Sequence, residues 1–347
     1  MDSVAFSPIS LADQQGIGEL DELLAGAGIR RDGSLDYIAG MYNSSRRLVA
    51  AGACSANTLR CLAVDDARQG EGLMAQMVSH LVEYQMAKGV AHLFLYTRCD
   101  KAPLFSSLGF HEIARVENQV AFMENRRDGF TDYLREIGAG RKGGRGAALV
   151  MNCNPFTLGH RYLAERAAAE NDVLHLFVVS EDASLIPFAD RYRMVEEGCG
   201  GLGNVALHRT DSYMISSAVF PAYFMEDRSE AIEAQAKLDL LLFSRIAAAL
   251  GVARRYVGEE PFSRVTGLYN QIMAERLPSL GIACVIIPRM EAGGQAVSAS
   301  RVRRLIHDGP IEAIKELVPP STYGYFLSEA GKRSIQRIRE AQNVTHY

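Results

Sequence analysis

The stretch "MNCNPFTLGH", Met151–His160, decides how this chain folds. It follows the apolar run "AALV" (residues 147–150), and an apolar run that ends in turn-forming residues is typical of a buried strand. Thr157 is a favourable residue for starting a helix, and Gly159 allows a ligand to approach the backbone closely. We therefore predict a buried strand that passes through a short polar loop directly into a helix.

Regular alternation of strand-like and helix-like segments continues from this stretch towards the C-terminus. The β-prone segments are residues 146–152, 173–179, 204–209, 254–258 and 282–288. Strands that alternate with helices of this length pair in parallel through right-handed crossovers, and ligands bind at the carboxyl ends of such strands. We predict the α/β class, with a doubly wound, Rossmann-like parallel sheet in this part of the chain.

The N-terminal third shows a different pattern. Three short β-prone segments separated by turn residues indicate an antiparallel meander: 36–42, 46–55 and 58–66. A helical stripe from Leu73 to Met86 follows, with Gly89 as its stop, and together these segments predict an α+β domain. Basic residues and glycines then accumulate between Arg126 and Arg145. We predict an N-terminal domain, a basic Gly-rich linker and a second domain ending in a helical tail: residues 1–128, 129–146 and 147–347.

Composition limits the classes of function. The 347 residues include 37 Lys and Arg against 41 Asp and Glu, a formal charge of −4. Without a long basic run we expect no nucleic-acid partner. Without a leader pattern or a run of about 18 apolar residues we expect a cytoplasmic protein with no membrane contact. The six cysteines and eight histidines show no metal-ligand spacing, so we expect reduced thiols and no metal site.

The helix predicted after the first strand has the features of an anion site. A helix that starts near Leu158 presents unpaired backbone N–H groups and the positive end of its dipole, which suits a phosphate. Pro155 removes one donor before the turn. Thr157 and His160 flank this position and can donate to a phosphate that gains charge during displacement at phosphorus. The alternative, a helix-capping Thr157 and a surface His160, stays open from these residues alone.

A second helix start carries a related signature. The stretch "VSASRVRR", Val297–Arg304, follows the fifth predicted strand and places Ser298 and Ser300 at the start of a helix. Arg301, Arg303 and Arg304 fall in its first turns. Cations at a helix N-terminus oppose the helix dipole, so local stability alone predicts acidic residues there. A bound anion would resolve this conflict.

These two stretches resemble the motifs of the nucleotidyltransferase superfamily. Thr157–His160 is similar to (H/T)-x-G-H, and Val297–Arg303 is similar to I-S-S-T-x-x-R. The resemblance implies bound ATP, with its α-phosphate at the first motif and its β- and γ-phosphates at the second. It implies catalytic roles for Thr157, His160 and Arg303. Nucleotide contacts are expected from residues of both motifs and of the fourth strand end: Asn152, Asn154, Phe156, Gly159, Gly258, Glu259, Ser298 and Ser300.

Four further charged residues near the predicted strand ends keep two interpretations each. Glu181 and Asp182 either orient Mg²⁺ or the nucleotide, or are solvated loop acids. Arg191 and Arg289 either hold phosphate or acetate, or pair with acidic residues. Cys153 lies in the stretch Met151–His160, at the predicted end of the strand, where packing is favoured over a role as nucleophile because no base is evident nearby.

The N-terminal third resembles the GCN5-related acetyltransferases. Their acyl-CoA loop, R/Q-x-x-G-x-G/A, corresponds to residues 67–72, although Ala67 departs from its first position. "LFSSLGF", residues 104–110, is similar to a later element of that family. The resemblance implies that backbone N–H groups around Gly70 and Gly72 hold a CoA-like pyrophosphate. The alternative is a tight strand-to-helix turn.

The order of the two domains, with the motifs in series over nearly the whole chain, resembles the citrate lyase ligase family. The resemblance implies an acid-thiol ligase that forms acetyl-adenylate from acetate and ATP, with Mg²⁺ expected alongside ATP. The acetyl group then passes to the thiol of a dephospho-CoA-like prosthetic group on the acyl carrier subunit of citrate lyase. Two alternatives remain: a carrier of the malonate decarboxylase or citramalate lyase type, and a non-catalytic protein that binds CoA or a nucleotide.

Overall fold

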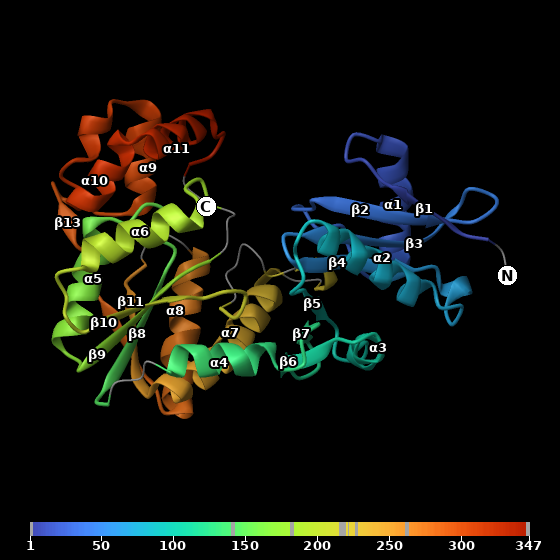
Figure 1. Cartoon of the computed structure of the whole chain (residues 1–347), viewed down its shortest axis with the longest axis horizontal. Helices are drawn as coiled ribbons and strands as arrows, with labels where there is room; N and C mark the ends of the chain where they lie inside the picture. The colour runs from blue at the N-terminus through green and yellow to red at the C-terminus, as the bar shows by residue number, and fades with distance from the viewer. Residues whose placement is uncertain are drawn as a thin grey trace. The chain divides into compact units, whose positions relative to one another are not determined.

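The computed structural model describes residues 3–139, 143–180, 184–214, 220, 222–225, 228–260 and 264–344. The chain divides into two compact units (Figure 1). Unit 1 comprises Met1–Asp132 and Val219–Leu238, and unit 2 comprises Tyr133–Ala218 and Asp239–Tyr347. The domain boundaries inferred from composition stay a prediction.

Unit 1 is built around a seven-stranded mixed sheet. Its elements are β1 (Ala5–Pro8), α1 (Gln14–Gly26), β2 (Tyr37–Tyr42), β3 (Leu48–Ser55), β4 (Thr58–Val64), η1 (Asp66–Arg68), α2 (Leu73–Ala87), β5 (Phe94–Thr97), α3 (Ala102–Ser107), β6 (His111–Val116) and β7 (Val120–Glu124). The strand order is β1-β2-β3-β4-β5-β7-β6. Strands β2, β3 and β4 pair antiparallel, so the predicted meander is confirmed.

Two helices cover separate apolar clusters of this sheet. Leu20 and Leu24 of α1 are buried in one cluster, and Met77 and Leu81 of α2 are buried in the other. Helix α2 begins at Leu73, where the helical stripe of the sequence begins, because Gly70 and Gly72 both have positive φ angles and break the helical path before it. The loop predicted to hold a pyrophosphate therefore leads directly into the first turn of α2.

The sole parallel pair among the strands of this sheet, β4 with β5, is short. It joins Thr58 to Phe94 and Leu59 to Leu95, and β4 continues to Val64 with pairing to β3 alone. The two strands thus separate on the side from which η1 and α2 follow.

A segment from the second half of the chain belongs to unit 1. The backbone N–H of Cys61 donates to the Tyr223 hydroxyl over 3.2 Å, and the N–H of Arg30 donates to the Tyr223 carbonyl over 2.9 Å. The ring of Phe220 packs edge-on against Tyr96 at 5.6 Å. These contacts explain why Val219–Leu238 groups with unit 1 although its neighbours in sequence group with unit 2.

Unit 2 contains a five-stranded sheet in which all strands are parallel. The chain enters it through α4 (Gly129–Gly138), and its other elements are β8 (Gly146–Met151), α5 (Leu158–Ala169), β9 (Val173–Val178), α6 (Phe188–Cys199), β10 (Val205–Arg209), β11 (Val252–Gly258), α8 (Arg264–Arg276), η3 (Leu277–Leu280), β12 (Ala283–Ile287), β13 (Glu291–Ala292), β14 (Gln295–Ala296), α9 (Ala299–Asp308), η4 (Ile311–Ile314), α10 (Pro320–Leu327) and α11 (Glu329–Glu340). The remaining elements, η2 (Ala222–Phe224) and α7 (Arg228–Leu250), precede β11. The α/β class and all five predicted strands are confirmed.

The strand order, β10-β9-β8-β11-β12, has its reversal point at β8. The chain runs from β8 to β9 and β10 on one side, and returns to β11 and β12 on the other. In open parallel sheets, ligands bind where the order reverses, beyond the carboxyl ends of the strands. The loop after Met151 therefore lies at the expected binding position. None of the helices in the described part of the chain is long and apolar enough to cross a membrane.

Candidate active site at the end of strand β8

The predicted strand-loop-helix transition is present. Strand β8 ends at Met151, and Cys153 turns the chain with a φ of 54°. Thr157 then begins α5 in an extended conformation. The loop is packed into the core, since Phe156 and Thr157 are at most 1% exposed. Burial raises the pKa of the Cys153 thiol, so the side chain stays protonated and acts in packing.

Thr157 and His160 hold each other in a reciprocal cap. The Thr157 hydroxyl accepts a hydrogen bond from the backbone N–H of His160 over 3.3 Å. The backbone N–H of Thr157 donates to Nδ1 of His160 over 3.1 Å. Because Nδ1 is the acceptor, the neutral imidazole carries its proton on Nε2. The capping role considered for Thr157 is thus present, and it fixes His160 as a donor.

His160 is neutral at physiological pH. Burial, together with the charges of Arg289 and Arg303, lowers its pKa from 6.5 to about 4. The ring is half-buried and lies parallel to Phe156, with the centroids 6.0 Å apart. No described residue accepts a hydrogen bond from its Nε2–H, which leaves this donor for a ligand.

A close contact joins the two predicted motifs. A Cβ atom on Gly159 would lie 2.5 Å from the carbonyl oxygen of Val297, so the first turn of α5 packs directly on the residue before the second helix start. The backbone N–H of Leu158 donates to Leu317 over 2.9 Å, which ties the same turn to the C-terminal helices. The two motifs, about 140 residues apart in sequence, are therefore neighbours in space.

The second motif begins α9 as predicted. Ser298 caps the helix by accepting from the backbone N–H of Arg301 over 3.2 Å, and its hydroxyl lies 3.1 Å from that of Ser300. The guanidinium of Arg301 donates to the carbonyls of Ala292 and Gln295 in the β13–β14 hairpin. The Arg301 cation, which opposes the dipole of α9 at this position, is therefore stabilised by backbone carbonyl oxygens.

Arg303 binds backbone carbonyls rather than lying open at the helix start. It is 3% exposed, donates through Nε to Val344 over 2.6 Å, and donates through Nη1 to the carbonyl of Asn154. This guanidinium therefore holds the loop of the first motif. A phosphate contact by Arg303 stays a prediction, and the geometry supports a positioning role.

The fourth strand end lies beside helix α5 of the first motif. The nearest atom to a Cβ built on Gly258 is Cδ2 of Leu163 in α5, at 3.8 Å, an ordinary van der Waals distance. The backbone N–H of Glu259 continues the β11–β12 pairing by donating to the carbonyl of Ile287 over 2.9 Å. Arg289 donates to the carbonyl of Glu259 over 2.7 Å and forms an ion pair with Glu260. Nucleotide contacts by Gly258 and Glu259 stay a prediction.

Asn152 and Asn154 occupy the loop in different ways. The side-chain oxygen of Asn152 accepts from Arg191 over 2.8 Å and from the Ser184 hydroxyl over 3.2 Å. The side-chain oxygen of Asn154 accepts from the backbone N–H of Ile186 over 3.3 Å. Sequence reasoning did not find Ser184, because a single loop serine has no distinguishing pattern. Glu181 and Asp182 lie outside the described residues.

The predicted pyrophosphate loop of unit 1 has an open helix start. Gly70 and Gly72 have φ angles of 86° and 78°, and a Cβ built on either would meet no atom within 4 Å. Gly72 begins α2 without a side-chain cap. The loop before it is held by an ion pair of 2.7 Å between Arg68 and Glu71.

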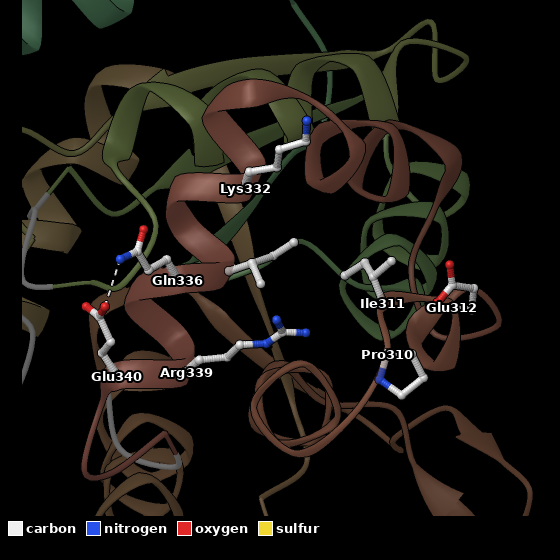
Figure 2. A pocket seen from close by; sticks show the side chains of 8 residues that line it. Pro310, Ile311, Glu312, Lys332, Gln336, Arg339 and Glu340 are labelled. Carbon is white, nitrogen blue, oxygen red and sulfur yellow. Dashed lines mark hydrogen bonds between the residues drawn. The ribbon is translucent and has the colours of Figure 1, made fainter.

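A surface groove of unit 2 lies apart from the predicted site residues. A groove of about 460 Å³ between η4 and α11 (Figure 2) contains none of the predicted site residues. It is lined by Pro310, Ile311, Glu312, Lys332, Ile335, Gln336, Arg339 and Glu340. Among the described residues, no group of three or more His, Cys, Asp or Glu side chains is placed to hold a metal ion.

The fold and the site define a two-unit α/β protein with a side-chain-capped helix start at the reversal point of its parallel sheet. The model of the citrate lyase ligase C-terminal domain family matches residues 146–326. The [citrate [pro-3S]-lyase] ligase of Klebsiella pneumoniae is 42% identical over 291 residues, covering 82% of this chain and 85% of that protein. That of Haemophilus influenzae is 34% identical over 330 residues, covering 92% and 97%. The chain belongs to the citrate lyase ligase family.

Solved acetyltransferase structures resemble part of the chain. A putative acyl-CoA N-acyltransferase from Klebsiella pneumoniae is 17% identical, covers 35% of this chain and 95% of its own, and has a TM-score of 0.31. A GNAT family N-acetyltransferase from Escherichia coli in complex with CoA is 20% identical, covers 37% and 84%, and has a TM-score of 0.29. The strand order β1-β2-β3-β4-β5-β7-β6 itself defines the fold of unit 1.

Replacing Gly159 by Ala should lower stability. The added Cβ would meet the Val297 backbone carbonyl at 2.5 Å, so one of the two motif segments must shift, at a cost of about 1–3 kcal/mol in the free energy of unfolding. Urea unfolding measures this difference. Gly324→Ala in α10, where a Cβ meets nothing within 4 Å, is the matched control and should be neutral or stabilising by up to about 1 kcal/mol. Equal stability of both variants would contradict the close contact.

Acidification should destabilise the protein partly through His160. The folded state holds its pKa at about 4, whereas the unfolded chain protonates it near the ordinary value of 6.5. Because the unfolded state binds more protons between these values, the free energy of unfolding falls as the pH drops from about 6.5 towards 4. In His160→Gln this fall should be smaller by about 2–3 kcal/mol, as measured by urea unfolding at several pH values. An unchanged pH dependence would show that His160 titrates normally.

Proposed function

We propose that this chain activates citrate lyase by acetylating its acyl carrier protein, as an acid-thiol ligase that consumes ATP. An acetate oxygen attacks the α-phosphorus of ATP, and pyrophosphate leaves as acetyl-adenylate forms. The thiol of the carrier's dephospho-CoA-like group then attacks the acetyl carbonyl, AMP leaves, and the thiol proton is released. The observation that carries the proposal is the Thr157-x-Gly-His160 helix start at the sheet reversal point of a chain with 42% identity to a [citrate [pro-3S]-lyase] ligase.

The first chemical step requires donors at the α-phosphate. Nε2–H of His160 and the backbone N–H of Gly159 would donate to its non-bridging oxygens, which gain negative charge as the acetate oxygen approaches. The N–H groups of Leu158 and His160 already donate to Leu317 and to the Thr157 hydroxyl. A neutral imidazole suits this arrangement because its Nδ1 can accept from the Thr157 N–H while its Nε2–H donates to the ligand, and the low pKa of His160 keeps it neutral. Thr157 acts through its cap, since it holds Nδ1 and thereby the orientation of the ring.

The remaining parts of ATP would be bound by the neighbouring strand and helix ends. Ser298, Ser300 and the first N–H groups of α9 are neutral donors for the β- and γ-phosphates. The end of β11 at Gly258 and Glu259, which lies beside α5, would contact the nucleoside. Mg²⁺ would supply further neutralisation of the phosphate charge.

Unit 1 would hold the carrier's prosthetic arm. The uncapped start of α2 after Gly70 and Gly72 offers backbone N–H groups in open space, which suits the pyrophosphate of a dephospho-CoA-like group. The separation of β4 from β5 beyond Leu59 lies on the side from which α2 follows. The free thiols of the six cysteines are consistent with a cytoplasmic reaction, where reduced carrier thiols persist.

The acid and the adenylation step can be tested together by acetate-dependent exchange of labelled pyrophosphate into ATP. Wild type should catalyse exchange with acetate, and not with citrate, with malonate or without acid. His160→Ala should lower kcat by roughly 10²–10³, the usual effect of removing one donor to a developing charge. His307→Ala, an exposed histidine at the end of α9, is the control and should keep wild-type exchange. Wild-type exchange by His160→Ala would contradict the role of His160 as a donor to the α-phosphate. If wild type catalyses no exchange, the proposed function is wrong.

Transfer to the carrier should depend on the start of α2. Gly72→Asn keeps a residue type that tolerates a positive φ, while its side chain enters the open space before the helix. The variant should keep acetate-dependent exchange and lose roughly tenfold or more in acetyl transfer to the carrier thiol. Gly89→Asn is the matched control, since Gly89 follows the other end of α2 with a φ of 81° and equally open space. Equal transfer by the two variants would contradict arm binding at Gly72.

A further inference from the structure

A backbone donor of unit 1 is occupied by a side chain from the second half of the sequence. Strand β4 separates from β5 after Leu59, the last of its residues that pairs with β5. Two residues further along β4, Cys61 has a positive φ of 52° and lies where the β3–β4 register shifts. Its backbone N–H donates to the hydroxyl of Tyr223 over 3.2 Å. The hydroxyl thus takes a donor of β4 at the point where the two strands have separated.

Aromatic side chains of the same segment bridge the two separated strands. Tyr223 contacts β4, and Phe220 packs edge-on against Tyr96 of β5, with the ring centroids 5.6 Å apart. Phe224 packs edge-on against both Phe220 and Tyr223, at 6.3 and 5.3 Å. The backbone is held separately, because the N–H of Arg30 donates to the carbonyl of Tyr223 over 2.9 Å. The hydroxyl contact with β4 can therefore break while the backbone of the segment stays in place.

The separation of the strands adjoins the position proposed for the carrier's arm. Beyond Cys61, β4 runs to Val64, and the chain then passes through η1 to the open helix start at Gly72. A dephospho-CoA-like arm whose pyrophosphate binds at Gly72 carries amide carbonyls along the rest of its length. Such a carbonyl is an acceptor of the same kind as the Tyr223 hydroxyl, so both can satisfy the N–H of Cys61.

We propose that Tyr223 makes an autoinhibitory contact: its hydroxyl holds the N–H of Cys61 in the ligand-free protein, and a carbonyl of the carrier's arm displaces it. This inference rests on the proposed function, because it assumes that unit 1 binds the arm. One hydrogen bond between uncharged groups is exchanged for an equivalent one, so the displacement itself costs little.

The contact makes unit 1 selective for a ligand that reaches both positions. The apparent affinity of a ligand falls with the fraction of molecules in which its site is already open. A ligand that binds at Gly72 as well as at Cys61 can offset this loss, whereas a small thiol that reaches Cys61 alone cannot. Tyr223 therefore disfavours free thiols as acceptors and favours the carrier's arm.

The first test measures the Kd for dephospho-CoA by calorimetry on the full-length protein. Tyr223→Phe keeps the ring and removes the hydroxyl, so the free protein loses the bond to Cys61 while the complex loses nothing. The Kd should fall roughly two- to tenfold, and the melting temperature of the ligand-free protein should fall as well. An unchanged or higher Kd would overturn the proposal, because the hydroxyl would then be purely structural or part of the binding surface.

Tyr37→Phe is the matched control for this variant. Tyr37 is a partly buried tyrosine of unit 1, and its hydroxyl lies 2.8 Å from Nε2 of His80. Removing this hydroxyl should lower the melting temperature and leave the Kd for dephospho-CoA unchanged. If both variants tightened the Kd equally, a general loosening of unit 1 would account for the effect and the proposal would be overturned.

The second test needs no variant. Hydroxyl-radical labelling mapped by mass spectrometry reports the solvent exposure of individual side chains. Dephospho-CoA should increase the labelling of Tyr223 in wild type, relative to Tyr37, because the displaced ring becomes more exposed. Unchanged or weaker labelling of Tyr223 in the complex would overturn the proposal.

Wild type separates the failure of this inference from that of the proposed function. If wild type catalyses acetate-dependent exchange and binds dephospho-CoA, while Tyr223→Phe binds it no more tightly, the inference alone is wrong. If wild type catalyses exchange but binds no dephospho-CoA, the arm site in unit 1 is wrong and the inference falls with it, whereas the adenylation step stands. Absence of exchange by wild type is the separate result that contradicts the proposed function.

Discussion

The contact between Gly159 and the carbonyl of Val297 is the constraint on which the arrangement of the site depends. Residue 159 must lack a side chain, because a Cβ would meet that carbonyl at 2.5 Å. The approach sets the starts of α5 and α9 against each other, so the N–H of Gly159 and the first N–H groups of α9 lie at one edge of the sheet. Each start is closed by its own hydroxyl cap, from Thr157 and from Ser298. A triphosphate is long enough to use both, which a single helix start could not offer.

Neutral donors and buried cations have different roles in the proposed site. His160 and the serine hydroxyls are the uncharged donors proposed to face ATP, whereas Arg191 and Arg303 are buried and donate to backbone carbonyls. The cations still act on the site through their charge, since Arg303 contributes to the low pKa of His160. Charges held in place by carbonyls do not have to reorganise when a phosphate gains charge, and this favours the transition state over the ground state.

Sequence patterns predicted the strands and the motif positions, because these depend on local apolar runs and on helix-start residues. The five parallel strands follow from runs such as residues 173–179, and the start of α5 follows from Thr157. The carbonyl partners of Arg191 and Arg303 could not be predicted, since a guanidinium reaches acceptors that lie far away in sequence, such as Val344 for Arg303. The return of Val219–Leu238 to unit 1 has the same cause, because it rests on contacts between Tyr223 and residues near the N-terminus.

The three helix N-termini proposed to bind phosphates differ in their N-caps. The cap decides which backbone N–H groups a ligand can use. Thr157 and Ser298 use side-chain oxygens to satisfy one N–H of the first turn, so α5 and α9 are stable before a ligand arrives. Helix α2 begins at Gly72 with no side-chain acceptor. Its first-turn N–H groups depend on solvent or on a ligand, and a ligand that enters can use all of them. A flexible prosthetic arm that must bind and leave in each turnover suits such a start, because no side chain has to be displaced and the backbone there is already set by the positive φ of Gly72.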